Sequence, residues 1–304
     1  MSRKGKMAFL FPGQGSQWVG MGYKLYQSSP KARKVFDEAD ETVGFKLSKL
    51  CFEGPEEKLR ETIYAQPAIM ATSIASLEAA TESDGSFAQP PTFVAGHSLG
   101  QYTALVAAKV VDFTEAISLV FERGQLMQEV GKKRRGKMVA ILGLDVDSLE
   151  SISQETDTQI SNINCPGQIV LSGREDNIVK AAALARDRGA RKAIFLEVSG
   201  AFHSHLMSPA LEEMADIISK VKLRDPVYPI IANTTAKPLT RASEIKQELI
   251  EHLCHCVRWQ HSIEYMITSG VSTFVEVGPG QVLTNLVKRI DRTILTRHIG
   301  DVPI

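Results

Sequence analysis

Short apolar runs alternate with longer segments of helical periodicity along most of the chain. The runs at 7–11, 91–95 and 273–277 each lead into a glycine-containing turn, which is typical of buried strands that feed loops. The segments 31–50 and 56–83 place Ala, Glu, Leu and Lys at helical spacing. This alternation predicts an α/β domain.

The pattern changes in the middle of the chain, where short strands and helices follow one another closely. Three apolar runs predict strands and two segments predict helices, in the order 138–142, 145–154, 168–172, 175–188 and 193–198. A β-α-β-α-β unit of about 60 residues matches a small ferredoxin-like arrangement. We therefore predict a ferredoxin-like subdomain at 129–198, inserted into a larger α/β domain that consists of 1–128 and 199–304. Its later elements are a helix at 209–221, a strand at 228–232 and helices through 243–269.

Charge and cysteine content exclude several classes of protein. The 304 residues contain 35 Lys and Arg and 35 Asp and Glu, so the net charge is zero and no bulk attraction to nucleic acid or to an anionic membrane is expected. Four irregularly spaced cysteines are too few for a disulfide framework. The first apolar run is broken by Pro12 and Gly13, too early for a signal peptide or a membrane span. We expect a cytoplasmic protein.

Ser98 lies in the segment Gly-His-Ser-Leu-Gly at 96–100, between a predicted strand and a predicted helix. A G-x-S-x-G turn in this context is typical of a nucleophile elbow, in which the strained turn projects the serine hydroxyl. The free N–H groups at the start of the following helix suit a developing oxyanion. The sequence therefore predicts a nucleophilic Ser98. The alternative is a serine that caps a helix after a glycine turn.

A serine nucleophile needs a base, and histidine is the usual one. The chain has seven histidines, most of them on predicted helices. His203 lies on a loop directly after the strand predicted at 193–198, the position where α/β proteins build their sites. His97 is next to Ser98, but neighbouring side chains in a tight turn diverge. Spacing alone favours His203 without excluding the others.

Several separated segments together resemble the malonyl-CoA:acyl carrier protein transacylase family. They are FPGQGSQ at 11–17, QP at 66–67, GHSLG at 96–100, Arg123 and Gly124 with Met127, NCPGQ at 164–168, GAFHS at 200–204, and EVGPG at 276–280 with Val282 and Leu283. The resemblance covers nearly the whole chain. It implies an α/β-hydrolase-like main domain with an inserted ferredoxin-like subdomain, in agreement with the fold predicted above.

The resemblance also implies the roles of the reacting groups. Ser98 is the nucleophile and His203 the base, oriented by a backbone carbonyl in place of a third side chain. The backbone N–H groups of Gln14 and Leu99 correspond to the family's oxyanion hole, and both are loop or helix-start amides.

Further positions concern the substrate. Arg123 matches the family arginine that binds the malonyl carboxylate, and a planar guanidinium can do so through two parallel hydrogen bonds. Phe202 fills the space that a methyl branch would need, which favours malonyl over methylmalonyl. Arg258 stands in the stretch expected to supply the carbonyl that orients His203, where many members have Gln, and we expect its side chain to line the pocket or to face solvent. Gln101 stands where many members have Glu.

The implied reaction is a ping-pong transfer of a malonyl group from coenzyme A to the phosphopantetheine thiol of an acyl carrier protein, for fatty acid or polyketide synthesis. It requires no metal or redox cofactor, and we expect a monomer. Carrier proteins are typically acidic, so a basic docking patch is expected. The candidates are Lys288 with Arg289, and the run 132–135 with Lys137, either of which could be only a solvated charge run.

Three alternatives accompany this interpretation. A lipase-like hydrolase would carry its triad in the order Ser, acid, His, whereas His203 lies in mid-chain. An acyl hydrolase or thioesterase of the same fold, acting on carrier proteins, typically lacks the arginine found here at position 123. A scaffold without activity would be expected to have lost Ser98 or His203. The cluster of His252, Cys254, His255 and Cys256 invites a metal, but it is crowded into one predicted helix without a second half-site.

Overall fold

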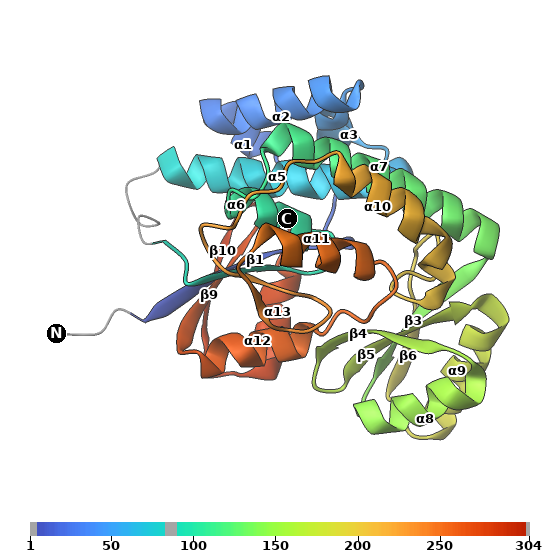
Figure 1. Cartoon of the computed structure of the whole chain (residues 1–304). Coiled ribbons are helices and arrows are strands. Elements are labelled where there is room, and N and C mark those ends of the chain that lie inside the picture. Colours follow the sequence, from blue (N-terminus) through green and yellow to red (C-terminus); the bar gives the residue numbers. More distant parts are fainter. Residues whose placement is uncertain (1–4, 83–89, 302–304) are drawn as a thin grey trace.

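The computed structural model describes residues 5–82 and 90–301, and within these ranges the chain forms two β-sheets (Figure 1). The larger sheet has six strands, in the spatial order β10 (Leu295–Ile299), β9 (Val271–Val277), β1 (Lys6–Phe11), β2 (Phe93–Gly96), β7 (Ile230–Ile231) and β8 (Pro238–Leu239). All neighbours pair in parallel except β7 and β8. The carboxyl ends of the parallel strands therefore meet at one edge, where α/β proteins bind their ligands.

Helices cover both faces of this sheet. They are α1 (Tyr23–Ser28), α2 (Pro30–Val43), α3 (Leu47–Glu53), α4 (Glu56–Arg60), α5 (Thr62–Glu82), α6 (Gly100–Ala107), α7 (Phe113–Arg134), the 3-10 helix η1 (His205–Ala210), α10 (Leu211–Ser219), α11 (Ala242–Glu251), α12 (Trp259–Thr268) and α13 (Val282–Ile290). In Figure 1, α2, α5 and α7 are stacked above the sheet, and α12 and α13 lie below it. No helix within the two described ranges is long and apolar enough to cross a membrane.

The central strand β1 shows why the sheet is buried on both faces. Met7, Phe9 and Phe11 belong to the core cluster that contains the buried residues of α2, α5 and α7. Ala8 and Leu10 belong to a second cluster, with the buried residues of α12 and α13. Successive side chains of a strand point to opposite faces, so a continuous apolar run is what a doubly covered parallel strand requires.

The smaller sheet contains four antiparallel strands, and it forms the subdomain. Its order is β4 (Gln159–Cys165), β5 (Gln168–Arg174), β3 (Gly136–Leu142) and β6 (Lys192–Phe195). Helices α8 (Val146–Thr156) and α9 (Glu175–Asp187) share a core cluster with these strands. The chain order βαββαβ is that of a ferredoxin-like unit. The predicted α/β fold class with a ferredoxin-like subdomain is confirmed.

The structure differs from the sequence prediction in several details. The pattern did not predict β4, because this strand carries the buried polar residues Ser161, Asn162 and Asn164, and it did not predict the partly exposed edge strand β10. The helix predicted at 31–50 is two helices, since Gly44 adopts a φ of 77° and ends α2. The helix predicted at 56–83 divides into α4 and α5, and residue 83 lies outside the described residues.

The elements of the smaller sheet lie inside the predicted subdomain range 129–198. Helix α7 runs without interruption through residue 129 to Arg134, and β3 begins at Gly136. At the other end β6 stops at Phe195, three residues before the predicted end of that strand. A long helix therefore links the main domain to the subdomain where the sequence suggested a break.

Gly100 is required by a close contact between helix α6 and strand β1 of the main sheet. A β-carbon at this position would lie 2.0 Å from the carbonyl oxygen of Phe11, at the end of β1. Helix α6 can start beside β1 only because this residue has no side chain.

This contact predicts the sign of a stability change. Helix propensity alone would make Gly100→Ala stabilising by up to about 1 kcal/mol. We expect the opposite, a loss of about 1–3 kcal/mol in the free energy of unfolding, because the added methyl group forces β1 and α6 apart. Urea unfolding of the variant tests this, and an unchanged or increased stability would show that the contact is relaxed without cost.

Candidate active site

Ser98 occupies the sharp turn between β2 and α6 at the carboxyl edge of the main sheet. Its backbone φ is 51°, a left-handed value that a non-glycine residue rarely adopts. Strained residues of this kind persist only where the surroundings fix them, and they cluster at active sites. The turn projects the hydroxyl as the sequence predicts for a nucleophile elbow.

His203 lies within hydrogen-bond distance of Ser98. The distance from Ser98 Oγ to His203 Nε2 is 2.8 Å, and His203 Nδ1 lies 2.8 Å from the backbone carbonyl oxygen of His252. A carbonyl only accepts hydrogen bonds, so Nδ1 carries the ring proton and Nε2 is left to accept the proton of the serine hydroxyl. Of the seven histidines, the structure brings His203 to the nucleophile in the geometry of a general base.

The orienting carbonyl comes from His252, and the expectation that it comes from the stretch around Arg258 is wrong. Helix α11 ends at Glu251, and the last carbonyls of a helix have no partner within it. The carbonyl of His252 is therefore free to accept from His203. Arg258 is exposed, directly precedes the first residue of α12 and is not among the residues that line the cavity at Ser98.

The surroundings of His203 keep its imidazole neutral. Its side chain is 4% exposed. Burial, and next the positive charge of Arg123, lower the pKa of His203 to about 3, against the raising effect of the carbonyl that accepts from Nδ1. At neutral pH the ring is therefore unprotonated and able to take a proton from Ser98.

Arg123 is a buried cation with free donors. It lies on α7 with 1% exposure, its Nη1 donates to the side-chain oxygen of Gln66, and its Cζ lies 5.0 Å from the ring centroid of Tyr102. Its Nε and Nη2 have no hydrogen-bond partner within residues 5–82 and 90–301. A buried charge with unsatisfied donors is costly unless it receives an anion, so this side chain is suited to bind a carboxylate.

Ser98, His203 and Arg123 share one cavity of about 280 Å³ between the main domain and the subdomain. Its walls include, from the main domain, Gln14, Gln66, Leu99, Phe202 and Leu283, and, from the subdomain and its exit, Met138, Asn162, Asn164, Gln168, Val170, Leu196 and Val198. Phe202, the residue before the base, also lines the cavity. The apolar lining strengthens any electrostatic interaction inside the cavity.

Gln14 and Leu99 both line the cavity. Neither backbone N–H donates a hydrogen bond to another group in the part of the chain that the structure describes. Gln14 follows β1 and Leu99 follows the elbow after the neighbouring strand β2, so the two residues reach the cavity from adjacent strands. This is the arrangement that an oxyanion hole needs.

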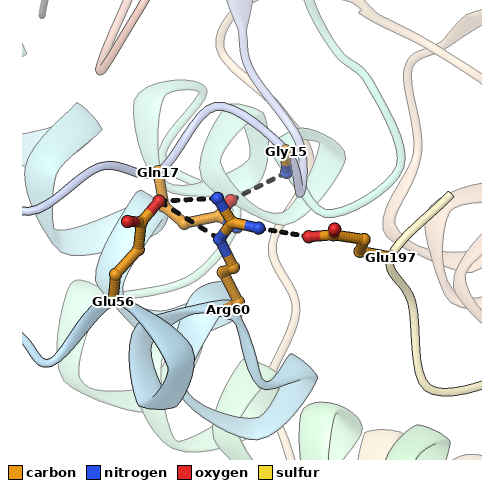
Figure 2. Close-up of polar contacts among 5 residues, drawn as sticks. All are labelled: Gly15, Gln17, Glu56, Arg60 and Glu197. Carbon is orange, nitrogen blue, oxygen red and sulfur yellow. Dashed lines mark hydrogen bonds and ion pairs between the residues drawn. The ribbon is translucent and has the colours of Figure 1, made fainter.

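The outer part of the Gln14 loop is fixed by local contacts. Figure 2 shows the Gln17 side chain folded back onto the Gly15 amide, a hydrogen bond of 2.7 Å. Beside this turn Arg60 contacts Glu56 on its own helix and Glu197 on the segment that follows β6. These side chains are exposed, and such ion pairs contribute little to stability.

Other polar groups of the site were not assigned a role from sequence. His97 Nε2 lies 2.8 Å from Asn164 Oδ1, so the side chain next to the nucleophile contacts the subdomain. Asn233 contacts the elbow and Gln66 contacts Arg123. The signal for Asn233 is that it lies two residues after the apolar strand β7, at the carboxyl edge of the sheet.

Lys288 and Arg289 lie exposed at the end of α13, outside the cavity. Arg289 donates to the side chain of Gln168, a cavity residue of the subdomain, so the basic pair borders the opening. Within residues 5–82 and 90–301, no three His, Cys, Asp or Glu side chains are arranged to hold a metal ion.

Comparison with known proteins places this geometry in a family. The acyl transferase domain family matches residues 8–295. The chain is 46% identical over 301 residues to a malonyl CoA-acyl carrier protein transacylase of Bacillus subtilis, covering 97% of this chain and 94% of the relative. It is 39% identical over 300 residues to the protein of the same name from Escherichia coli K12, covering 97% and 96%.

Solved structures agree with the sequence relatives. An acyl-carrier-protein-S-malonyltransferase from Bartonella henselae superposes with a TM-score of 0.93 at 39% identity, over 97% of this chain and 96% of the other. A malonyl-transacylase in complex with a type II polyketide synthase acyl-carrier protein superposes with a TM-score of 0.93 at 37% identity, over 97% and 96%. The resemblance noted in the sequence is confirmed, and the chain belongs to the malonyl CoA-acyl carrier protein transacylase family.

Proposed function

We propose that this protein transfers a malonyl group from coenzyme A to the phosphopantetheine thiol of an acyl carrier protein, through a malonyl ester of Ser98. The observation that carries the proposal is the buried guanidinium of Arg123, with two free donors, in the same cavity as the Ser98–His203 pair. Of the residues that line this cavity, Arg123 alone carries a full charge at neutral pH. The site therefore favours an acyl group that ends in a carboxylate.

The first step forms the malonyl ester. The Ser98 hydroxyl proton moves to His203 Nε2 while Oγ attacks the thioester carbonyl, and the amides of Gln14 and Leu99 hold the resulting oxyanion. Collapse of this intermediate breaks the carbon–sulfur bond. The proton on His203 passes to the departing sulfur of coenzyme A, which leaves as a thiol.

The second step reverses the roles. His203 takes the proton of the carrier protein's thiol, and the sulfur of that thiol attacks the carbonyl carbon of the malonyl ester. The ester bond to Ser98 then breaks, and Ser98 Oγ regains its proton from His203. Water must be kept from the ester meanwhile, and the apolar walls of the cavity favour this. A hydrolase of the same fold would release malonate at this point.

Each step is completed by proton transfer within the pair, so we propose that no metal or redox cofactor takes part. We propose further that the protein acts as a cytoplasmic monomer. All four cysteines, Cys51, Cys165, Cys254 and Cys256, are unpaired thiols, as suits a reducing compartment.

A basic hollow beside the cavity is the proposed docking surface for the carrier protein. Arg191, Lys192, Arg289 and Arg292 line this hollow of about 480 Å³, where the subdomain faces the end of α13, and Lys288 is next to it in sequence. Such a surface complements an acidic partner. The other basic candidate, 132–135, includes the last turn of α7, where basic side chains complement the helix dipole.

The docking proposal predicts a selective effect of charge reversal. We expect Lys192→Glu combined with Arg292→Glu to raise the KM for the carrier protein about tenfold at low salt, with the difference shrinking as salt is added. The KM for malonyl-CoA should stay within about twofold. Lys34→Glu on α2, whose side chain is 76% exposed, is the control and should change neither constant. A rise confined to the KM for malonyl-CoA would assign the hollow to coenzyme A phosphates instead.

The proposed binding of the malonyl carboxylate by Arg123 predicts that replacing this residue changes the acyl selectivity. Arg123→Met keeps the side-chain volume but removes the charge and its donors, so malonyl transfer should fall by about 100-fold or more, corresponding to the loss of a bidentate ion pair. Acetyl transfer, which does not use these donors, should change by less than about fivefold. Competition of malonyl-CoA and acetyl-CoA for Ser98, read by intact mass, measures both. Equal losses would remove the carboxylate role of Arg123.

The neutral state of His203 predicts the pH dependence of the first step. Because the pKa of the ring is lowered to about 3, the imidazole is unprotonated throughout the range from pH 5 to pH 8, and kcat/KM for malonyl-CoA should show no loss near pH 6.5. Burial remains in Arg123→Met but the nearby cation is gone, so the pKa should rise and the acid limb should move toward neutral pH. A wild-type profile that falls by half near pH 6.5 would contradict the prediction.

A further inference from the structure

The strained turn at Ser98 is held from both sides by one buried side chain. Asn233 is 1% exposed; its Oδ1 accepts a hydrogen bond from the Ser98 backbone N–H at 2.8 Å, and its Nδ2 donates to the carbonyl oxygen of Gly96 at 2.8 Å. A side-chain amide that bridges two backbone groups of the elbow fixes the direction in which the nucleophile points. Asn233 thus supplies the surrounding constraint that a φ of 51° at Ser98 requires.

Asn233 is in turn anchored by the carboxylate of Glu248, on α11. Glu248 Oε1 accepts from the backbone N–H groups of Asn233 at 2.7 Å and Thr234 at 3.0 Å, and Oε2 accepts from the Thr234 hydroxyl. The side-chain nitrogen of Gln101, on the helix that follows the elbow, also donates to Oε1, at 3.3 Å.

Glu248 is 4% exposed and forms no ion pair within residues 5–82 and 90–301. A buried carboxylate without a cation is tolerated only where hydrogen-bond donors satisfy it. The four donors therefore stabilise the Glu248 carboxylate in place of a cation. Gln101 contributes one of these donors. A glutamate at position 101 would place a second carboxylate against the first.

The same turn of α11 also orients the base. The backbone N–H of His252 donates to the carbonyl oxygen of Glu248 at 2.8 Å, and the carbonyl oxygen of His252 accepts from His203 Nδ1 at 2.8 Å. Glu248 and His252 are four residues apart, one helical turn, which has a fixed rise. The last turn of α11 is therefore connected to both reacting residues. It reaches Ser98 through the Glu248 side chain and Asn233, and it reaches His203 through the His252 carbonyl.

We propose that Glu248 is a positioning residue that acts through Asn233, and that the last turn of α11 sets the geometry of Ser98 relative to His203. Neither residue touches the reacting atoms. The inference rests on the proposed function only in taking Ser98 and His203 as the reacting pair, since the network itself contains no group that binds a malonyl carboxylate or a carrier protein.

The test removes the two members of the network singly and together. Asn233→Ala and Glu248→Ala should each slow the formation of malonyl-Ser98 in a single turnover by about 100-fold, the loss expected for a misplaced nucleophile. The KM for malonyl-CoA should change less than about twofold, because Arg123 is untouched. Since the two residues act along one path, the double variant should be no slower than the slower single variant. Independent, multiplying losses would overturn the proposal.

Conservative variants keep the test decisive if the alanine variants fold poorly. Glu248→Gln retains an acceptor for the two backbone amides and a donor for Thr234, so it should recover the rate to within about fivefold of wild type. Thr234→Val removes one of the four donors and should slow the reaction by about threefold to tenfold. Full activity of Thr234→Val together with full loss in Glu248→Gln would contradict the assigned contacts.

A matched control separates positioning from stability. Glu244 lies on the same helix and its carboxylate accepts from the amides of Thr240 and Arg241, but it is exposed and its hydrogen bonds do not involve Asn233 or the elbow. Glu244→Ala should lower the unfolding midpoint while leaving the rate constant per folded molecule unchanged. If Asn233→Ala behaves in the same way, the network only stabilises the fold and the proposal fails.

Reaction with phenylmethanesulfonyl fluoride, a serine-directed reagent, tests the positioning role of Asn233 and Glu248 separately from the proposed malonyl transfer. Its amplitude counts the folded sites, and its rate reports how well Ser98 is aligned with His203, with no need for an acyl substrate. The same order of variants should appear as with malonyl-CoA. If wild type reacts with the reagent but never forms malonyl-Ser98, the proposed function fails while the positioning role is still judged by the variants.

Discussion

The close approach of β1, β2 and the start of α6 is the constraint on which the rest of the site depends. Gly100 lies against the carbonyl of Phe11, and Ser98 must adopt a left-handed backbone for the chain to turn from β2 into α6. Because β1 and β2 are adjacent parallel strands, their carboxyl ends deliver Gln14 and Leu99 to the same side of Ser98. A more relaxed turn would aim the hydroxyl elsewhere and separate the two amides.

The inserted subdomain helps to bring Arg123 and His203 to the same cavity. Its entry and exit run side by side: a β-carbon on Gly131, near the end of α7, would lie 2.3 Å from the carbonyl oxygen of Ser199. Arg123 stands on α7 before this neck and His203 follows shortly after it. The insertion thus brings a carboxylate receptor and a base to one cavity, although 80 residues of sequence separate them.

Electrostatics divides the site into two regions with different tasks. Arg123 is a buried cation with free hydrogen-bond donors, so it is stabilised by binding an anion. Burial and the charge of Arg123 together keep the imidazole of His203 neutral. The elbow itself is connected through Asn233 to the carboxylate of Glu248, whose oxygens accept hydrogen bonds from Asn233 and Thr234. The site therefore uses one carboxylate to organise the backbone of the elbow and one cation to bind the substrate.

The sequence by itself determined the local features of this protein. The apolar run of β1, the Gly-His-Ser-Leu-Gly turn and the loop position of His203 follow from periodicity and turn chemistry, which depend on near neighbours in the chain. Only the tertiary structure decided which carbonyl orients His203, because that depends on where α11 ends in space, and this placed His252 where the sequence suggested Arg258. The roles of Asn233 and Glu248 likewise arise from contacts between elements more than a hundred residues apart, and no local pattern encodes such contacts.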